Sequence, residues 1–292
     1  MRKLFLALVF TSVLTFSACG EKPHTPVDID DVEDVNEEIE AWSLPNASEV
    51  TDSYTRYNAI RYAERRADLP EVTLSDRMFD LYIPKSSVPQ DGFPLIVFFH
   101  GGGFKDGSRG ENNPVFRGMI AKGYAVISAD YYQYREINPS VRMTSEVENT
   151  CVKEACVDAS LLMAFIDKNA SVMGIDKNKV FLMGGSAGAM TCLKMCLVDK
   201  VPAPKVKAVI DMWGKLADLA SITKDVPPVL IIHGDEDTTI SISNSYSLKE
   251  RLSELNVTCE MITMEGKGHA QYRYVADNYL NNISEFLSAS IK

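Results

Sequence analysis

A serine enclosed by glycines constrains this chain more than any other feature. The stretch 179–197 reads KVFLMGGSAGAMTCLKMCL, and its apolar run Val180–Met183 predicts a strand. The residues after the serine predict a helix, because apolar side chains recur there at helical spacing. Gly184 and Gly188 let strand and helix approach closely around a strained turn. The sequence therefore predicts strand, tight turn and helix, with the hydroxyl of Ser186 exposed at the turn.

Apolar runs of strand length alternate with helical patterns along most of the chain. Leu95–Phe99 and Tyr124–Ala129 are continuously apolar, as in strands that are covered on both faces. This alternation predicts an α/β fold with a mostly parallel central sheet, helices on both faces, and ligands at the carboxyl ends of the strands. At 292 residues and 46% hydrophobic content, one such domain can bury a substantial core. The expected strands are Tyr54–Tyr62, Arg77–Ile83, Leu95–Phe99, Tyr124–Ala129, Val180–Met183, Val206–Asp211, Val229–Ile232 and Cys259–Met264, and the expected helices include Pro114–Lys122, Glu146–Lys168, Ser243–Leu255 and Tyr272–Leu287.

The amino terminus is expected to be an export signal and not part of the folded domain. Arg2 and Lys3 precede the apolar run Leu4–Phe16, which is short for a membrane span, and small residues follow before Cys19. The segment resembles the signal peptide of bacterial lipoproteins. The resemblance implies removal of residues 1–18, a lipid on Cys19, and an exported protein anchored at the bacterial cell envelope. The alternative is a plain secretory signal that contains a cysteine.

An acidic segment follows the expected signal. Asp28–Glu40 holds eight acidic residues and no basic one, a composition that cannot bury enough surface to fold alone. We therefore expect residues 19–48 to be a tether and residues 49–292 to be the folded domain. The whole chain has 30 basic and 40 acidic residues, a net charge of −10, and no basic cluster. This excludes nucleic acid as an expected partner and leaves the lipid as the expected contact with a membrane.

The sequence offers little from which to build a metal site. It contains no Cys-x-x-Cys, no His-Glu-x-x-His and only four histidines, so no metal is expected. Five cysteines remain besides Cys19, and an odd number leaves at least one free even if an exported chain pairs the others. Cys192 and Cys196 lie four apart on one expected helix, where the Cβ directions diverge. We expect these two to be buried and unbridged.

Three consecutive glycines follow the expected strand Leu95–Phe99. The run His100–Phe104 reads HGGGF, and its glycines free the backbone to turn N–H groups toward a ligand. HGGGF, the pair Asp130-Tyr131 and the GGSAGA around Ser186 resemble the α/β-hydrolase esterases and lipases, including hormone-sensitive-lipase-like and bacterial carbohydrate esterases. The resemblance extends from about residue 77 to the carboxyl terminus. It implies an α/β-hydrolase fold, a shaping role for the first residue of HGGGF, and an oxyanion hole built from the N–H groups of Gly102, Gly103 and Ala187.

An acid and then a histidine must follow Ser186 in a chain of this kind. The run His233–Ile240 reads HGDEDTTI and resembles the HGxxD loop of that family, in which Asp237 matches the acid. Asp235 is a rival, but it lies closer to the turn, where a short carboxylate bonds to backbone N–H groups two residues on. His269 is left as the base, because the other three histidines lie in the tether, in HGGGF and before the acid.

These residues predict acyl transfer in two halves. His269 takes the proton of Ser186, Asp237 holds the imidazole, and backbone amides receive the oxyanion. An acyl-enzyme forms and water releases it, so no metal or organic cofactor is needed. The expected activity is hydrolysis of carboxylic esters.

The substrate is predicted less narrowly than the chemistry. Only about a dozen residues separate Trp213 from Pro227, so no large cap or lid domain is expected. An open cleft fits acetyl or feruloyl esters of plant polysaccharide, as in acetyl xylan esterases, better than long-chain lipid. Candidate sugar platforms, which pack in the core under the alternative interpretation, are Tyr131, Tyr132, Tyr134 and Trp213.

Three other functions stay open at the level of sequence. A prolyl-oligopeptidase-type peptidase shares the order of serine, acid and histidine, but normally carries a large N-terminal propeller. An arylformamidase-like amidase would differ in its pocket. A non-catalytic, glycan-binding surface lipoprotein is the candidate from another class, and the intact Ser186, Asp237 and His269 argue against it.

Overall fold

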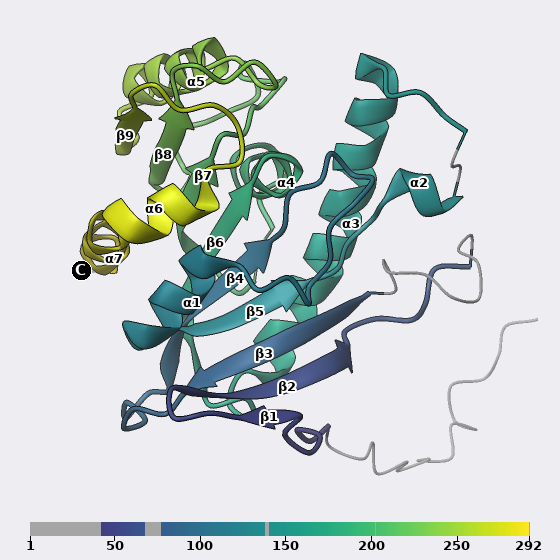
Figure 1. The fold of residues 1–292 in the computed structure, drawn as a ribbon, viewed down its shortest axis with the longest axis vertical. Helices are drawn as coiled ribbons and strands as arrows, with labels where there is room; N and C mark the ends of the chain where they lie inside the picture. The colour runs from purple at the N-terminus through teal and green to yellow at the C-terminus, as the bar shows by residue number, and fades with distance from the viewer. Residues whose placement is uncertain (1–41, 68–76, 138–139, 202, 292) are drawn as a thin grey trace, which may run out of the picture. The chain divides into compact units, whose positions relative to one another are not determined.

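The computed structural model describes residues 42–67, 77–137, 140–201 and 203–291, and in these ranges nine strands form one sheet. The strand order is β1-β2-β3-β5-β4-β6-β7-β8-β9 (Figure 1). Pairing is antiparallel from β1 to β5 and parallel from β5 to β9, which confirms the mostly parallel sheet. The strands are β1 (Glu49–Val50), β2 (Tyr54–Arg61), β3 (Met78–Pro84), β4 (Phe93–Phe99), β5 (Ala125–Ala129), β6 (Ile175–Gly185), β7 (Val206–Met212), β8 (Val229–Gly234) and β9 (Cys259–Met264).

Helices cover both faces of the sheet, as predicted. Alternate side chains of one strand enter different hydrophobic clusters: Ile96 and Phe98 of β4 pack with α1, α6 and α7, whereas Leu95 and Val97 pack with α3 and α4. This alternation follows from the two-residue period of a strand. The helices are α1 (Pro114–Ala121), α2 (Tyr134–Ile137), α3 (Ser145–Asn169), α4 (Ala187–Leu193), α5 (Ser243–Glu254), α6 (Tyr272–Asn278) and α7 (Leu280–Ala289), and a π-helical turn, η2 (Lys194–Asp199), follows α4.

Several boundaries differ from the sequence-based expectation. Strand β6 begins five residues early, because Ile175 already pairs with Phe93. The closing helix is broken at Tyr279, whose φ of −125° leaves the helical range. The break brings Leu280 onto Gly118 of α1, where a Cβ would overlap the Leu280 side chain. The short elements β1 and α2 were not expected at all.

The compact unit begins at Trp42, seven residues before the expected boundary. The Trp42 ring packs edge-on against Phe165, with ring centroids 5.0 Å apart, and Leu44 also packs on the core. These apolar contacts draw the end of the expected tether into the domain. The expected signal, Cys19 and the acidic segment lie outside the described residues. Within the described ranges, no helix combines the length and the apolar character that crossing a bilayer requires.

Two further expectations concern the cysteines after Ser186 and the connection between β7 and β8. Cys192 and Cys196 are buried and unbridged, as predicted, and the other three cysteines of the described residues are also free. Between β7 and β8 the chain forms no helix or strand. In the described residues, this segment therefore adds no cap domain between the two strands.

Candidate active site

Ser186 lies at the sharp turn between β6 and α4. Its backbone has φ 54° and ψ −120°, a left-handed conformation that is rare outside glycine. A Cβ at Gly184 would lie 2.6 Å from the Ala189 backbone N, and one at Gly188 would overlap the carbonyl of Phe99. Only glycine fits either position, so the predicted strand, turn and helix are confirmed together with their physical reason. Ser186 is partly exposed between buried neighbours.

The structure brings the predicted serine, histidine and acid into one line of hydrogen bonds. Ser186 Oγ lies 2.9 Å from His269 Nε2, and His269 Nδ1 lies 2.6 Å from Asp237 Oδ2. The residues come from β6–α4, the loop after β9 and the loop after β8, which all meet at the carboxyl edge of the parallel strands. A carboxylate on Nδ1 requires a proton there, which leaves Nε2 free to accept the proton of the serine.

Asp237 is held as a carboxylate by its surroundings. Its side chain is fully buried, and its Oδ1 accepts hydrogen bonds from the N–H groups of Thr239 and Ile240 at 2.8 and 2.9 Å. Burial by itself raises the pKa of Asp237. The hydrogen bonds from His269 and from the two backbone N–H groups outweigh it and hold the pKa below its usual range.

Asp235 has a different partner from the one expected. The sequence predicted a bond to backbone N–H groups two residues on, but this contact is made by Asp237 and that prediction is wrong for Asp235. Instead Asp235 Oδ1 accepts a 2.7 Å hydrogen bond from the N–H of Gly266. Asp235 is exposed and ties its own loop to the loop that carries His269.

The sequence excludes His233 as the catalytic base, but in the structure its side chain packs against the acid, Asp237. It is fully buried, and its Nε2 lies 2.9 Å from the Ile240 carbonyl and 3.2 Å from Asp237 Oδ2. Ser245 Oγ lies 2.7 Å from the other ring nitrogen, Nδ1. Burial lowers the pKa of His233, which favours the neutral ring. The available signal was its place four residues before Asp237, where a side chain can reach back to the acid.

The glycine-rich loop packs against the nucleophile turn. Gly102 has φ 120°, and a Cβ there would overlap the Asp106 carbonyl, so the loop needs glycine at this point. His100 is buried and its Nδ1 donates to the Gly101 carbonyl at 2.7 Å. Burial lowers the pKa of His100 to about 4, so the ring is neutral and shapes the loop. In the described part of the chain, no hydrogen bond involves the N–H groups of the three predicted oxyanion residues, Gly102, Gly103 and Ala187.

A buried ion-pair network fixes the continuation of this loop. The Arg109 guanidinium contacts Asp130 Oδ2 and lies 3.0 Å from Asp80 Oδ1, and its backbone N–H donates to Asp130 Oδ1 at 2.6 Å. Arg56 bonds the other oxygen of Asp80 at 2.5 Å. Burial raises the pKa of Asp130 to about 6 although Arg109 opposes the rise. The network, which we call the Arg109 network, joins the loop to β2, β3 and the end of β5.

The candidate sugar platforms are not available to a ligand. Exposed fractions are 0% for Tyr131 and Trp213, 9% for Tyr132 and 5% for Tyr134. Their rings pack in the core, so the alternative interpretation of these residues holds.

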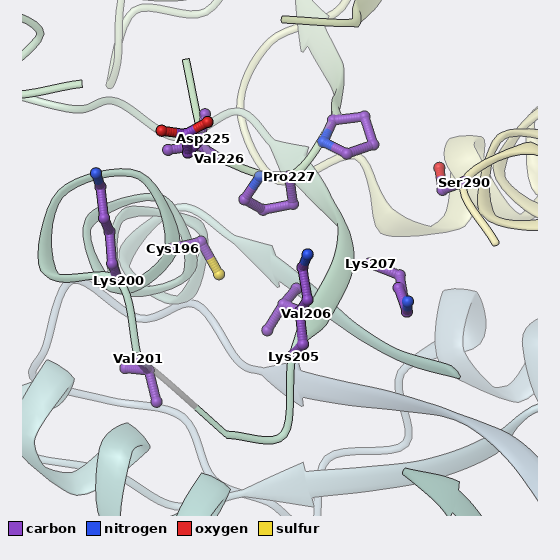
Figure 2. Close-up of a pocket in the computed structure, with 11 residues that line it drawn as sticks. Cys196, Lys200, Val201, Lys205, Val206, Lys207, Asp225, Val226, Pro227 and Ser290 are labelled. Carbon is purple, nitrogen blue, oxygen red and sulfur yellow. The ribbon is translucent and has the colours of Figure 1, made fainter. Parts of the chain in front are cut away.

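A hollow of about 530 Å³ lies at the opposite edge of the sheet, where β7 and β8 begin (Figure 2). Lys200, Lys205, Lys207 and Asp225 contribute to its lining, which includes none of the predicted site residues. The predicted site residues lie at the carboxyl edge and not in this hollow. In the ranges that the structure describes, no three His, Cys, Asp or Glu side chains gather closely enough to hold a metal ion.

The chain is similar to two curated proteins that carry the names of hydrolases. The chain is 21% identical to the isoprenylcysteine alpha-carbonyl methylesterase ICME of Arabidopsis thaliana over 77% of its length and 60% of the relative's. It is 26% identical to the kynurenine formamidase of Danio rerio over 65% of its length and 58% of the relative's. The chain thus spans about 60% of the length of the curated relatives that it matches.

Among solved structures, a truncated carbohydrate esterase from gut microbiota superposes with a TM-score of 0.65 at 16% identity, covering 84% of this chain and 99% of that one. The likeness gives this chain the α/β-hydrolase fold. A sequence profile of the prolyl oligopeptidase family matches residues 199–292. A profile of the BD-FAE family matches residues 79–224, which are half of the chain, and the chain therefore belongs to the BD-FAE family.

Proposed function

We propose that this protein is a serine hydrolase that cleaves carboxylic esters through Ser186, His269 and Asp237. The observation that carries the proposal is the unbroken line of hydrogen bonds from Ser186 Oγ to His269, 2.9 Å, and from His269 to Asp237, 2.6 Å. The esterase names among the relatives and the BD-FAE membership support the same reaction class.

In the first half-reaction the Ser186 oxygen bonds to the acyl carbon while its proton passes to Nε2 of His269. Asp237 stabilises the imidazolium that results, because it stays ionised. The N–H groups of Gly102, Gly103 and Ala187 donate to the oxyanion, and the imidazolium returns its proton to the departing alcohol. Water then repeats the sequence on the acyl-enzyme and releases the acid.

The substrate class we propose is short acyl or feruloyl groups carried on carbohydrate. No helix or strand lies between β7 and β8 in the described chain, so that segment adds no cap helix over the carboxyl edge. One structural neighbour carries the name of a carbohydrate esterase from gut microbiota. A bulky sugar alcohol and a small acyl group suit an open carboxyl edge.

Amide hydrolysis is the second candidate, because one relative carries the name kynurenine formamidase. The same serine, histidine and acid serve esters and amides, and the leaving group distinguishes them. The prolyl oligopeptidase profile matches residues 199–292, the part of the chain that contains Asp237 and His269. This match adds peptides to the candidate amide substrates. A glycan-binding protein without catalysis would need none of the hydrogen bonds around His269.

The experiment is labelling with a fluorophosphonate, together with turnover of nitrophenyl acetate, acetylated and feruloylated oligosaccharides, and aryl formamides. We expect the wild-type protein to be labelled and Ser186→Ala to be folded, unlabelled and about 10⁴-fold or more slower. Near-wild-type turnover by Ser186→Ala would overturn the nucleophile assignment. A wild-type protein that is not labelled but binds the oligosaccharides would indicate the glycan-binding alternative.

We also propose that the protein acts at the bacterial cell envelope, anchored through a lipid on Cys19. The support is the basic, apolar and small-residue pattern of the first nineteen residues.

A further inference from the structure

Tyr272 lies three residues after His269, at the start of α6. Its ring is edge-on to Trp213, with centroids 4.9 Å apart, and to Phe98 of β4 at 6.3 Å. Trp213 in turn lies 6.3 Å from the His269 ring. An aromatic row therefore runs from the carboxyl end of β4 through Tyr272 to the histidine, beneath the site in which the reaction is proposed to occur.

The hydroxyl of Tyr272 is placed against the backbone of two active-site segments. A Cβ at Gly185, the residue before the nucleophile, would overlap this hydroxyl. A Cβ at Gly101, the first glycine of HGGGF, would lie 3.2 Å from the same oxygen and 3.6 Å from Ser186 Cβ. The hydroxyl thus fills the space where the nucleophile turn and the glycine-rich loop approach each other, and it explains why Gly185 has no side chain.

Packing alone does not account for this hydroxyl. The oxygen is buried, and no group of the described residues meets the distances and angles of a hydrogen bond with it; the backbone N–H of Gly101 lies close enough only to oppose, in part, the rise of its pKa. An unpaired buried hydroxyl opposes folding, and a phenylalanine would supply the same ring contacts without it. Burial also raises the pKa of Tyr272 far above its usual range, so the hydroxyl keeps its proton and brings no charge to the site. What the oxygen contributes is its volume and its fixed position.

We propose that Tyr272 is a positioning residue, whose hydroxyl sets the spacing between the nucleophile turn and the oxyanion loop. The proposal rests on the proposed function, because that spacing matters only if Ser186 attacks while the amides of Gly102 and Gly103 receive the oxyanion. A displacement of about 1 Å between such groups is enough to slow acyl transfer strongly. The ring contributes separately, through its contact with Trp213.

The test compares Tyr272→Phe with Tyr274→Phe on nitrophenyl acetate. Tyr274 lies two residues further along the same helix, and its ring contacts Lys267 and Tyr279. We expect Tyr272→Phe to keep or raise Tm, keep KM, and lower kcat and the rate of fluorophosphonate labelling by about tenfold. Tyr274→Phe should keep the wild-type kcat. The pH profile of kcat/KM should not shift in Tyr272→Phe, because the hydroxyl faces the backbone of the two segments and not His269.

A second arm tests the contact itself with Gly185→Ala in both backgrounds. The new methyl meets the Tyr272 hydroxyl first and the ring carbons Cζ and Cε1 at 2.7 and 2.9 Å, so removal of the hydroxyl relieves the closest overlap. We expect Gly185→Ala to cost less activity in the Tyr272→Phe background than in the wild type, a coupling that independent sites do not give. Wild-type kcat in Tyr272→Phe, or additive effects in the cycle, overturns the proposal. Ser186→Ala with wild-type activity overturns the proposed function instead.

Discussion

Two aspartates, two residues apart, have different tasks at the candidate site. Asp237 accepts from His269, and Asp235 accepts from the N–H of Gly266 in the loop that carries the histidine. Only the first contact can orient the imidazole, because it fixes which ring nitrogen carries the proton. The second contact holds one loop to the other.

We therefore expect Asp237→Asn to lower kcat by about 10⁴, the loss typical of a histidine left in the wrong tautomer. Asp235→Asn should cost about 1 kcal/mol of unfolding free energy for a weakened hydrogen bond, with a much smaller change in kcat. The measurement is kcat of both variants with thermal melts alongside. A large loss of kcat in Asp235→Asn alone would mean that the two roles are reversed.

Asp211 is a buried acid that the reaction does not use. It is fully buried at the end of β7, and Oδ1 accepts from the Gly214 N–H at 2.9 Å while Oδ2 has no partner in the described residues. Burial raises its pKa to about 7. The folded state therefore binds this proton more tightly than the unfolded state does. The tighter proton binding adds to the free energy of unfolding. This contribution is fully present below about pH 4, near the pKa of an unfolded aspartate, and is lost as the pH rises toward 7.

Asp211→Asn should remove that pH dependence, because the amide carries no charge and its oxygen can still accept from Gly214. Relative to the variant, the wild type should lose up to about 4 kcal/mol of unfolding free energy between pH 4 and pH 8, at about 1.4 kcal/mol per unit of pKa. Urea unfolding of both proteins at the two pH values measures the difference. Equal changes in the two proteins would show that folding does not raise the pKa of Asp211.

At the scale of elements, the Arg109 network holds the segment that follows the glycine-rich loop against the sheet. The loop leaves β4 and returns into α1, and Arg109 ties it to the Asp130 and Asp80 carboxylates, which are 0% and 1% exposed. Removing the guanidinium leaves buried carboxylates short of a partner, which is far costlier than loss of an exposed pair.

Arg109→Gln should therefore lower the unfolding free energy by about 3–5 kcal/mol. The matched control is Arg135→Gln, which breaks the exposed pair with Asp106 and should cost about 0–1 kcal/mol. Denaturant unfolding of both variants at pH 8 makes the comparison. A cost below 1 kcal/mol for Arg109→Gln would mean that the loop does not depend on the network.

At the scale of the whole molecule, the amino-terminal pattern supports the proposal that a lipid on Cys19 anchors the protein at the cell envelope. Cys19→Ala in the full-length chain should move the protein from the membrane fraction to the soluble one, because lipidation requires the thiol. Fractionation of the expressing cells, with activity and immunodetection in each fraction, is the measurement. Unchanged partitioning would exclude a lipid on Cys19 as the anchor.

The sequence alone determined the fold class and which three residues, Ser186, Asp237 and His269, were expected to meet at one site. Strand runs, helical spacing and close-packed glycines are local properties, and the family resemblance supplied the acid among two candidates. Tertiary structure alone decided what surrounds these residues. The contact of Tyr272 with Gly185 and the Arg109 network join residues that are far apart in the chain, and no spacing in the sequence records such contacts. Burial of the four candidate sugar platforms has the same reason, because an aromatic side chain is equally typical of a core and of a cleft until its neighbours are in place.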